Sequence, residues 1–483
     1  MSYTDLSLRA LADSLACREL SVRELCEQYL SEIKEKDAEI GAYLTICAES
    51  ALARADECDR IRARAEQATG ALFGIPYALK DNLCTRGVRT TCASRMLAHF
   101  VSPYDATVQS RLRAAGGVLL GKLNMDEFAM GSSGEHSALG TTRNPHDLSR
   151  VAGGSSCGSA AAVAAHLAPF ALGSDTGGSV RLPAAYCGVV GMRPTYGAVS
   201  RYGLVAFASS LDVVGPIARS VYDNALVLSA LIGRDAHDAT SREHLEPDFL
   251  LHIEGGVRGL RIGIPEEFFD KACDPEVSCA VLRAADVLRA AGAVLVPLSL
   301  PIPDVALAAY YLLSSAEASS NLARFDGVRY GHRAADYTDI DDLFSRSRAE
   351  GFGLEVKRRI LAGTAVLSVG YYDEYYKRAS AARARVRDDL LAALSVCDVI
   401  LSPTAPTVAH RFGERASTEQ MMLGDRYAIP ASLGGLPALS LPCGTNSDGM
   451  PIGMQLVGAP FCERLLYRVG YTYECETRGG GNE

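Results

Sequence analysis

The sequence lacks any apolar run long enough to cross a membrane. Its most apolar stretch, residues 160–173, is interrupted by His166 and Pro169 and is shorter than the ~20 residues that a spanning helix needs. The first residues also lack a basic segment followed by an apolar run, the pattern of a secretory signal. We therefore expect no membrane span and no export, and a cytoplasmic location.

Paired cysteines and a basic footprint are also missing. The 14 cysteines are scattered between Cys17 and Cys475 without a C-x-x-C pair, which argues against a metal or redox motif and favours reduced thiols used as small core residues. The formal net charge is −9, whereas a protein that grips a polyphosphate backbone usually carries a basic patch. If nucleic acid is part of the substrate, a partner must supply most of the contacts to it.

What is present is the composition of a large globular α/β protein. Of the 483 residues, 48% are hydrophobic and 22% are charged. Short apolar runs alternate with helical patterns, and an apolar helical face over residues 277–291 separates two of these runs. Such alternation predicts an α/β sheet covered by helices. The runs that predict strands are residues 118–121, 260–264, 294–298, 399–401 and 454–457.

Two other segments have a helical pattern. Residues 1–60 predict an N-terminal helical segment, in which Ser21 and Glu24 form a capping box at a helix start. Residues 307–394 predict a helical insertion that lies over the sheet. The last residues, 478–483, are rich in glycine and predict a flexible tail.

Two glycine- and serine-rich stretches, residues 153–159 and 173–181, mark the candidate site. A flexible linker would have the same composition, but apolar segments flank these stretches. A phosphate-binding loop is the stronger alternative, yet the motif G-x-x-x-x-G-K-[ST] is absent. Glycines before a serine let successive N–H groups converge on one point, as the oxyanion of an acyl transfer requires. We predict Ser179 as the nucleophile and the amides of Thr176, Gly177 and Gly178 as oxyanion donors.

A serine nucleophile needs a base, and histidine does not supply an obvious one. Neither stretch contains a histidine, and no G-x-S-x-G elbow is present. Lys80 ends an apolar run that starts at residue 73, and burial lowers the pKa of a lysine. A neutral Lys80 could therefore accept the proton. Taken alone, a lysine at a strand end is more often a surface charge or an ion-pair partner of a residue such as Asp81, and the case for Lys80 comes from its combination with the two stretches.

Together, Lys80 and the two stretches resemble the signature of the amidase-signature hydrolases. The three blocks occur in the family's order, and the resemblance implies one amidase domain over residues 1–483, with a large mixed sheet covered by helices on both faces and a signature core at residues 70–220. It implies a Lys–Ser–Ser triad in which Ser179 is the nucleophile, Lys80 the base and Ser155 the bridging serine, held by a cis peptide bond.

Within this family the chain resembles the A subunits of glutamyl-tRNA(Gln)/aspartyl-tRNA(Asn) amidotransferases. Further blocks, such as residues 122–131, 317–331, 355–360, 370–376 and 436–444, carry this resemblance. It implies that Tyr310, Arg359 and Asp425 grip the backbone of glutamine. Tyr311 could replace Tyr310, Arg358 could replace Arg359, and Asp425 could instead cap a helix. Two positions depart from the pattern, Cys157 where glycine is usual and Leu182 where glutamine is usual.

The resemblance implies a glutaminase that delivers ammonia to one of two partner subunits. That partner uses ATP and Mg²⁺ to amidate Glu-tRNA(Gln), Asp-tRNA(Asn) or both, so this chain itself would bind no cofactor or metal, and charged tRNA would contact mainly a partner. Two alternatives remain at this point, a free-standing amidase that acts on other amides and an inactive scaffold protein within a complex.

Overall fold

The structure, a computed structural model, is built on one mixed sheet and describes residues 3–64, 70–415 and 418–478. Eleven strands follow the order β1-β3-β2-β6-β8-β7-β12-β13-β11-β9-β10. Pairs within β3-β2-β6 and within β11-β9-β10 are parallel, and the other neighbouring pairs are antiparallel. The bounds are β1 (Tyr43–Ile46), β2 (Pro76–Lys80), β3 (Val118–Leu123), β6 (Phe170–Asp175), β7 (Val190–Arg193), β8 (Val213–Ala218), β9 (Arg261–Pro265), β10 (Val294–Leu298), β11 (Val399–Pro403), β12 (Ala438–Thr445) and β13 (Pro451–Val457), with a separate hairpin of β4 (Arg143–Asn144) and β5 (Asp147–Val151).

All five strands predicted from apolar runs are present, as β3, β9, β10, β11 and β13. The predicted capping box is also confirmed, because Ser21 and Glu24 each bond the other's backbone N–H at the start of α2. The helices are α1 (Leu8–Ala16), α2 (Val22–Ile40), α3 (Ala48–Ala63), α4 (Thr107–Ala114), α5 (Cys157–Ala164), α6 (Arg181–Tyr186), α7 (Val221–Leu231), α8 (Pro275–Ala290), α9 (Pro303–Leu322), α10 (Ile340–Gly351), α11 (Leu354–Leu367), α12 (Lys377–Val396), α13 (Thr418–Gly424), α14 (Ile429–Gly434) and α15 (Glu463–Arg478). Short helical turns are η1 (Tyr3–Asp5), η2 (Arg95–Leu97), η3 (Glu127–Ala129), η4 (Glu266–Phe268) and η5 (Tyr372–Tyr376).

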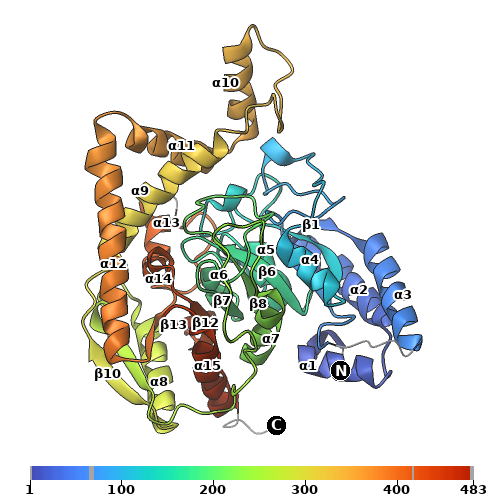
Figure 1. Cartoon of the computed structure of the whole chain (residues 1–483), viewed down its shortest axis with the longest axis vertical. Helices are drawn as coiled ribbons and strands as arrows, with labels where there is room; N and C mark the ends of the chain where they lie inside the picture. Colours follow the sequence, from blue (N-terminus) through green and yellow to red (C-terminus); the bar gives the residue numbers. More distant parts are fainter. Residues whose placement is uncertain (1–2, 65–69, 416–417, 479–483) are drawn as a thin grey trace.

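The N-terminal segment is not helical throughout. Its helices α1 to α3 lie at the edge of the molecule (Figure 1), but between α2 and α3 the chain forms the edge strand β1, which pairs with β3. Four half-exposed residues between two helices give no period that sequence analysis can detect. The predicted flexible tail lies outside the described residues from residue 479 onward. Within the described ranges, no helix is both long and apolar enough to span a bilayer.

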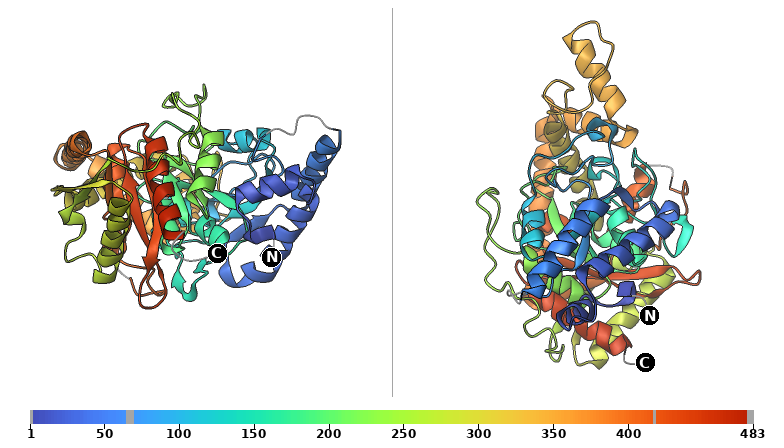
Figure 2. Two further views of the ribbon diagram at one scale, coloured as in Figure 1. Left: turned by 90° about the horizontal axis from the view of Figure 1, so that it is seen from below. Right: turned by 90° about the vertical axis from the view of Figure 1, so that its right-hand side faces the viewer.

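Helices cover both faces of the sheet, as the packing of β12 and β13 shows. A Cβ placed on Gly470 of α15 would meet Leu439, whereas a Cβ on Gly453 of β13 would meet Ala185 of α6 and lies near Ser440. Leu439 and Ser440 are neighbours on β12, and neighbouring side chains of a strand point to opposite faces. The two helices therefore pack on opposite sides of the sheet, whose layers are seen from two further directions in Figure 2.

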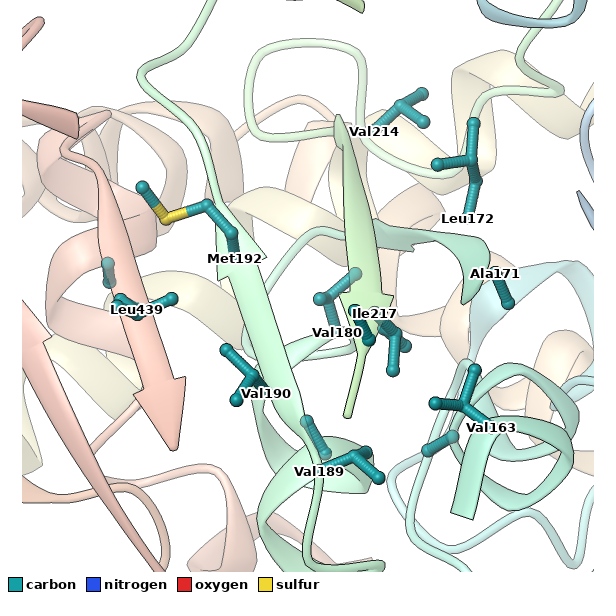
Figure 3. Packing of buried hydrophobic residues seen from close by; sticks show 14 of the residues in the cluster. Val163, Ala171, Leu172, Val180, Val189, Val190, Met192, Val214, Ile217 and Leu439 are labelled. Carbon is teal, nitrogen blue, oxygen red and sulfur yellow. The ribbon is translucent and has the colours of Figure 1, made fainter. Parts of the chain in front are cut away.

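The centre of the sheet is packed with small branched side chains. Val190, Val214, Ile217 and Leu439 come from the adjacent strands β7, β8 and β12, and they lie together with Leu172 of β6 in Figure 3. All of these side chains are inaccessible to solvent. Close packing of β-branched residues holds the strands at fixed spacing, and the ends of these strands therefore form a rigid support.

Four helices occupy the segment of the predicted helical insertion. Helices α9, α11 and α12 pack at one side of the sheet, and α10 projects away from the body (Figure 1). The clustered tyrosines form the π-helical turn η5 before α12. Helix α9 carries Tyr310 and α11 carries Arg359, so the contact between these two helices sets how the two side chains meet.

Replacing Gly363 by alanine should weaken this helix pair. Gly363 of α11 lies against α9 so closely that a Cβ would fall 1.9 Å from the carbonyl oxygen of Ser315. Because the obstacle is backbone, we expect a loss of about 1–3 kcal/mol in the free energy of unfolding, measured by urea denaturation. The control is Ala362→Ser on the exposed face of the same helix. Equal stability of the two variants would contradict the described packing.

Candidate active site

Three parallel strands bring the candidate residues to one edge of the sheet. Strand β2 lies between β3 and β6 and runs parallel to both. Lys80 is the last residue of β2, the loop at residues 124–134 follows β3, and Ser179 follows β6 by four residues. The carboxyl ends of parallel strands are a common place for active sites because loops from different parts of the chain converge there.

Lys80 is completely buried and is surrounded by hydroxyl groups. Its Nζ lies 2.7 Å from Ser155 Oγ, 2.9 Å from Ser156 Oγ and 3.0 Å from Ser174 Oγ, with the Ser174 carbonyl oxygen at 3.3 Å. The side-chain amide of Asn82 donates to the same Ser174 hydroxyl at 2.9 Å. A neutral amine can both donate to such hydroxyls and accept a proton from one of them, which suits Lys80 to the role of base.

Burial lowers the pKa of Lys80 to about 8, although nearby carboxylates such as Asp175 partly oppose this effect. Asp175 is itself neutralised by two buried arginines, Arg181 at 3.1 Å and Arg193 at 2.9 Å. No carboxylate forms an ion pair with Lys80 in the described part of the chain, since Asp81 pairs with Lys122 at 3.2 Å instead. The ion-pair alternative for Lys80 is therefore excluded.

Ser155, the predicted bridging serine, follows the cis peptide bond that the resemblance implies, between Gly154 and Ser155. The N–H of Gly154 donates to the carbonyl oxygen of Ser132 at 2.9 Å, and the Ser155 carbonyl oxygen accepts from the N–H of Asp126 at 3.2 Å. A Cβ on Gly154 would lie 1.9 Å from Asp126 Oδ2, so no other residue fits there without movement. The loop after β3 thus fixes both sides of the cis peptide.

The loop of Ser179 is fixed by Asp175. The two carboxylate oxygens of Asp175 accept from the N–H groups of Gly178 at 3.0 Å and Val180 at 3.2 Å. The carbonyl oxygen of Ser179 accepts from the N–H of Ser156 at 3.1 Å, which ties the two glycine-rich stretches together. Ser179 is 7% exposed and is thus the accessible serine at this point, while Ser155 and Ser156 are fully buried.

One of the three predicted oxyanion donors is engaged elsewhere. The Gly178 amide already donates to Asp175, so in this structure it does not point at an oxyanion. The amides of Gly177 and Ser179 donate to no protein group among residues 3–64, 70–415 and 418–478. Gly178 instead contributes its φ of +132°, which favours glycine and turns the chain before the nucleophile.

The three residues predicted to bind glutamine meet around a fourth, Tyr311. The Tyr311 hydroxyl donates to Asp425 Oδ2 at 3.0 Å, and the guanidinium of Arg359 lies 4.5 Å from the centre of the Tyr311 ring. The Tyr310 and Tyr311 rings pack edge to face at 5.1 Å. Ser132 also donates to Asp425, at 2.5 Å, and burial raises the pKa of Asp425 to about 6. A buried anion and a buried cation therefore lie on either side of one tyrosine.

This cluster adjoins the nucleophile loop. A Cβ on Gly177 would lie 2.5 Å from Tyr310 Cζ, so the Tyr310 ring rests directly on the loop. The Nε of Arg359 is bonded to Glu355 at 2.7 Å, but its buried Nη1 has no hydrogen-bond partner in the described part of the chain. This nitrogen is available to a carboxylate of a substrate.

Burial and contacts in the structure favour one side of two alternatives that the sequence left open. Arg359 is 5% exposed and faces Tyr311, whereas the side chain of Arg358 is 53% exposed. The carboxylate of Asp425 accepts hydrogen bonds from the hydroxyls of Ser132 and Tyr311 and does not cap a helix. Sequence analysis missed Ser132, which directly follows the block at residues 122–131 and has no distinguishing motif.

Neither departure from the family pattern disturbs the site. Cys157 is the first residue of α5, where it does not adopt a positive φ, and its side chain packs against Gly134. Leu182 is buried in a small apolar cluster with Val151 and Tyr186. Among the described residues, no group of three or more His, Cys, Asp or Glu side chains is placed to hold a metal ion.

Comparison with known proteins identifies the family. The profile of the family described as Amidase matches residues 24–467, which is most of the chain. The chain belongs to the amidase family. Its α/β fold with a large mixed sheet is therefore an amidase fold.

Individual relatives and solved structures show which members of the amidase family this chain is similar to. The chain is 54% identical over 473 residues to the A subunit of glutamyl-tRNA(Gln) amidotransferase from Moorella thermoacetica, covering 98% of this chain and 96% of the relative. Among solved structures, the A subunit of glutamyl-tRNA(Gln) amidotransferase from Thermotoga maritima is similar at 41% identity with a TM-score of 0.81, covering 98% of this chain and 95% of that chain. Peptide amidase from Stenotrophomonas maltophilia is similar at 33% identity with a TM-score of 0.84, covering 99% and 98%.

The pKa values in the site predict how amidase activity changes with pH. Lys80 acts as a base only when neutral, so kcat/KM should rise by about tenfold per pH unit up to a pH near 8 and then level off. Asp425 must be ionised to bind an ammonium group. Below a pH of about 6, kcat/KM for an amino-acid amide should therefore fall more steeply with decreasing pH. A neutral amide should not show that second step.

The control for this profile is Lys80→Arg, which should have no activity at any pH because a guanidinium stays protonated. Steady-state rates from pH 5 to pH 10 provide the measurement. A profile that is flat between pH 6 and 8, or an active Lys80→Arg variant, would show that Lys80 is not the base.

Proposed function

We propose that this chain is the glutamine-hydrolysing A subunit of a tRNA-dependent amidotransferase. The observation that carries the proposal is the pairing of a buried cation, Arg359, with a buried anion, Asp425, next to the loop of Ser179. A glutamine backbone has the opposite arrangement of charges, a carboxylate and an ammonium group. The similarity to A subunits over 98% of the chain supports the same conclusion.

In the proposed reaction, glutamine binds with its α-carboxylate on Arg359 and its α-ammonium on Asp425. The ring of Tyr310 lies against Gly177, next to this clamp and close to the nucleophile. The aliphatic part of glutamine then extends toward Ser179 and places the side-chain amide at the oxyanion donors. Thr176 and Gly177, together with the amide of Ser179 itself, would stabilise the negative charge on the amide oxygen.

The chemistry follows from the position of Lys80. Ser179 Oγ attacks the amide carbon while its proton passes to Ser155, whose own proton passes to the neutral Nζ of Lys80. The tetrahedral intermediate collapses when the same relay returns a proton to the departing nitrogen, which leaves as ammonia. Water then attacks the γ-glutamyl ester while the relay takes one proton from the water. The relay returns this proton to Ser179 Oγ as the ester bond breaks, and glutamate and free Ser179 are produced.

The ammonia is used elsewhere in the proposed complex. One partner would use ATP and Mg²⁺ to activate the carboxylate of Glu-tRNA(Gln) or Asp-tRNA(Asn), and ammonia would then form the amide. We propose a heterotrimer of this chain with two partner subunits in the cytoplasm, with charged tRNA held mainly by a partner. The net charge of −9 supports this division, because the chain shows no basic footprint for tRNA.

Removing either charge of the clamp should damage glutamine turnover selectively. Arg359→Ala or Asp425→Ala leaves a substrate charge unpaired in a buried site, which costs about 2–5 kcal/mol and lowers kcat/KM for glutamine by about 30-fold or more. An uncharged primary amide lacks both groups, so kcat/KM for that substrate should fall much less. The measurement is steady-state kinetics of the purified complex on both substrates.

Two controls make this comparison decisive. Arg358→Ala changes a neighbouring exposed arginine and should leave glutamine turnover near wild type, whereas Ser179→Ala should abolish turnover of both substrates. Equal losses on both substrates in Arg359→Ala and Asp425→Ala would refute the clamp, and the chain would then be a general amidase like the peptide amidase it resembles.

A further inference from the structure

The loop at residues 126–134 connects the active site with a projecting part of the molecule. On one side it bonds the cis peptide through Asp126 and contacts Asp425 through Ser132. On its other side it contacts the base of what we call the arm, residues 326–353, which contains α10. The arm extends beyond the body of the protein and is seen at the same end of the molecule in Figure 1 and in the right-hand view of Figure 2.

Glu127 makes the polar part of this connection. Its side chain is 2% exposed, and Oε2 accepts the N–H of Gly353 at 2.8 Å, at the junction of α10 and α11. Oε1 accepts from the Ser94 hydroxyl, whose oxygen also lies 3.2 Å from the Gly351 carbonyl oxygen. Both hydrogen-bond partners are neutral. Burial raises the pKa of Glu127 to about 6, and the nearby Lys357 and His136 partly oppose this effect. At neutral pH this position therefore holds a buried carboxylate that is stabilised by its hydrogen bonds to Gly353 and Ser94.

Phe128 makes the apolar part. Its ring centre lies 5.0 Å from that of Phe325, which directly precedes the arm, and 5.6 Å from that of Phe352 near the end of the arm. Phe128 and Ala129 both have a positive φ, +50° and +62°. Two consecutive residues other than glycine rarely adopt this conformation. The contacts with the arm therefore hold the loop in a shape that its own backbone does not favour.

Burying a carboxylate whose hydrogen-bond partners are all neutral costs free energy, because the hydrogen bonds must offset the desolvation of the charge. One of its two partners, the N–H of Gly353, lies on the arm, and the other, the hydroxyl of Ser94, also contacts the arm at the carbonyl oxygen of Gly351. Its chain neighbour Asp126 donates its N–H to the carbonyl oxygen of Ser155. We propose that Glu127 is a positioning residue for glutamine hydrolysis, through which the arm fixes the 126–134 loop and hence the bridging Ser155 and the carboxylate of Asp425. The proposal takes glutamine as the substrate from the proposed function, whereas the contacts on which it is based do not depend on that function.

Two substitutions disturb this contact from opposite sides. Glu127→Gln keeps the volume but leaves one acceptor oxygen for two donors. Gly353→Ala changes only the arm side, since Gly353 has an ordinary φ of −72° and a new Cβ would lie 2.2 Å from Glu127 Oε2. Two matched controls lie on the arm. Glu350→Gln removes an exposed ion pair with His332, and in Gly351→Ala the new Cβ meets the flexible end of Met96.

The primary readout is the rate at which a fluorophosphonate, a general serine-reactive probe, labels Ser179 in the full chain. We expect Glu127→Gln and Gly353→Ala each to slow labelling by about tenfold or more, as for the loss of a hydrogen bond to a charged group. The double variant should be little worse than either single variant, because both break the same contact. Both controls should label at the wild-type rate.

Glutamine kinetics separates positioning from general loss of structure. Both test variants should lower kcat and raise KM for glutamine, while KM for an uncharged amide stays the same, because only glutamine uses Asp425. Wild-type labelling rates in both variants would overturn the proposal, and so would losses that match the fraction of unfolded protein in thermal melts. If the wild type labels at Ser179 but does not hydrolyse glutamine, the proposed function fails, and the labelling rates still decide the role of Glu127.

Discussion

The site depends on the burial of one amine among hydroxyl groups. Lys80 Nζ contacts Ser155, Ser156 and Ser174, and it has no ion-pair partner in the described part of the chain. A lysine in water keeps its proton at neutral pH and cannot act as a base. Removing water without supplying an ion-pair partner lowers its pKa to about 8, and this would make the proposed relay from Ser179 possible.

Much of the surrounding structure preserves that condition. Asp175 is required to fix the nucleophile loop, yet its negative charge near Lys80 would hold the proton on the amine. Arg181 and Arg193 neutralise it from the other side, so the loop is fixed and the amine stays easy to deprotonate. The parallel strands β2, β3 and β6 bring all of these groups to one edge, and the packed valines of the central strands keep that edge rigid.

Sequence analysis succeeded where the pattern is local. The apolar runs of β3, β9, β10, β11 and β13 and the Ser21–Glu24 capping box depend on neighbouring residues alone. The placement of Lys80 beside Ser155 was reached through the family resemblance, because 75 residues separate the two in the sequence. Strand β1 was missed because an edge strand of four residues shows no burial pattern.

The remaining features come from tertiary contacts that no motif encodes. The occupied Gly178 amide, the role of Tyr311 between Arg359 and Asp425, and the contact of Glu127 with Gly353 each join segments that are brought together only by the fold. Adjacent tyrosines and adjacent arginines also cannot be distinguished by residue type. Burial separates the two arginines, since one of the pair faces the site and the other faces solvent.

The central claim, that burial lowers the pKa of Lys80 enough to supply neutral amine near neutral pH, can be tested by observing the amine itself. Protein labelled with ¹³C at the ε-carbon of lysine gives one NMR signal per lysine, and each signal shifts when its amine loses a proton. The account predicts one signal that titrates with a pKa near 8 and disappears in Lys80→Arg, while exposed lysines titrate near their usual ~10.4. If the Lys80 signal titrates with the others, almost no neutral amine is present near neutral pH, and the proposed base catalysis is wrong.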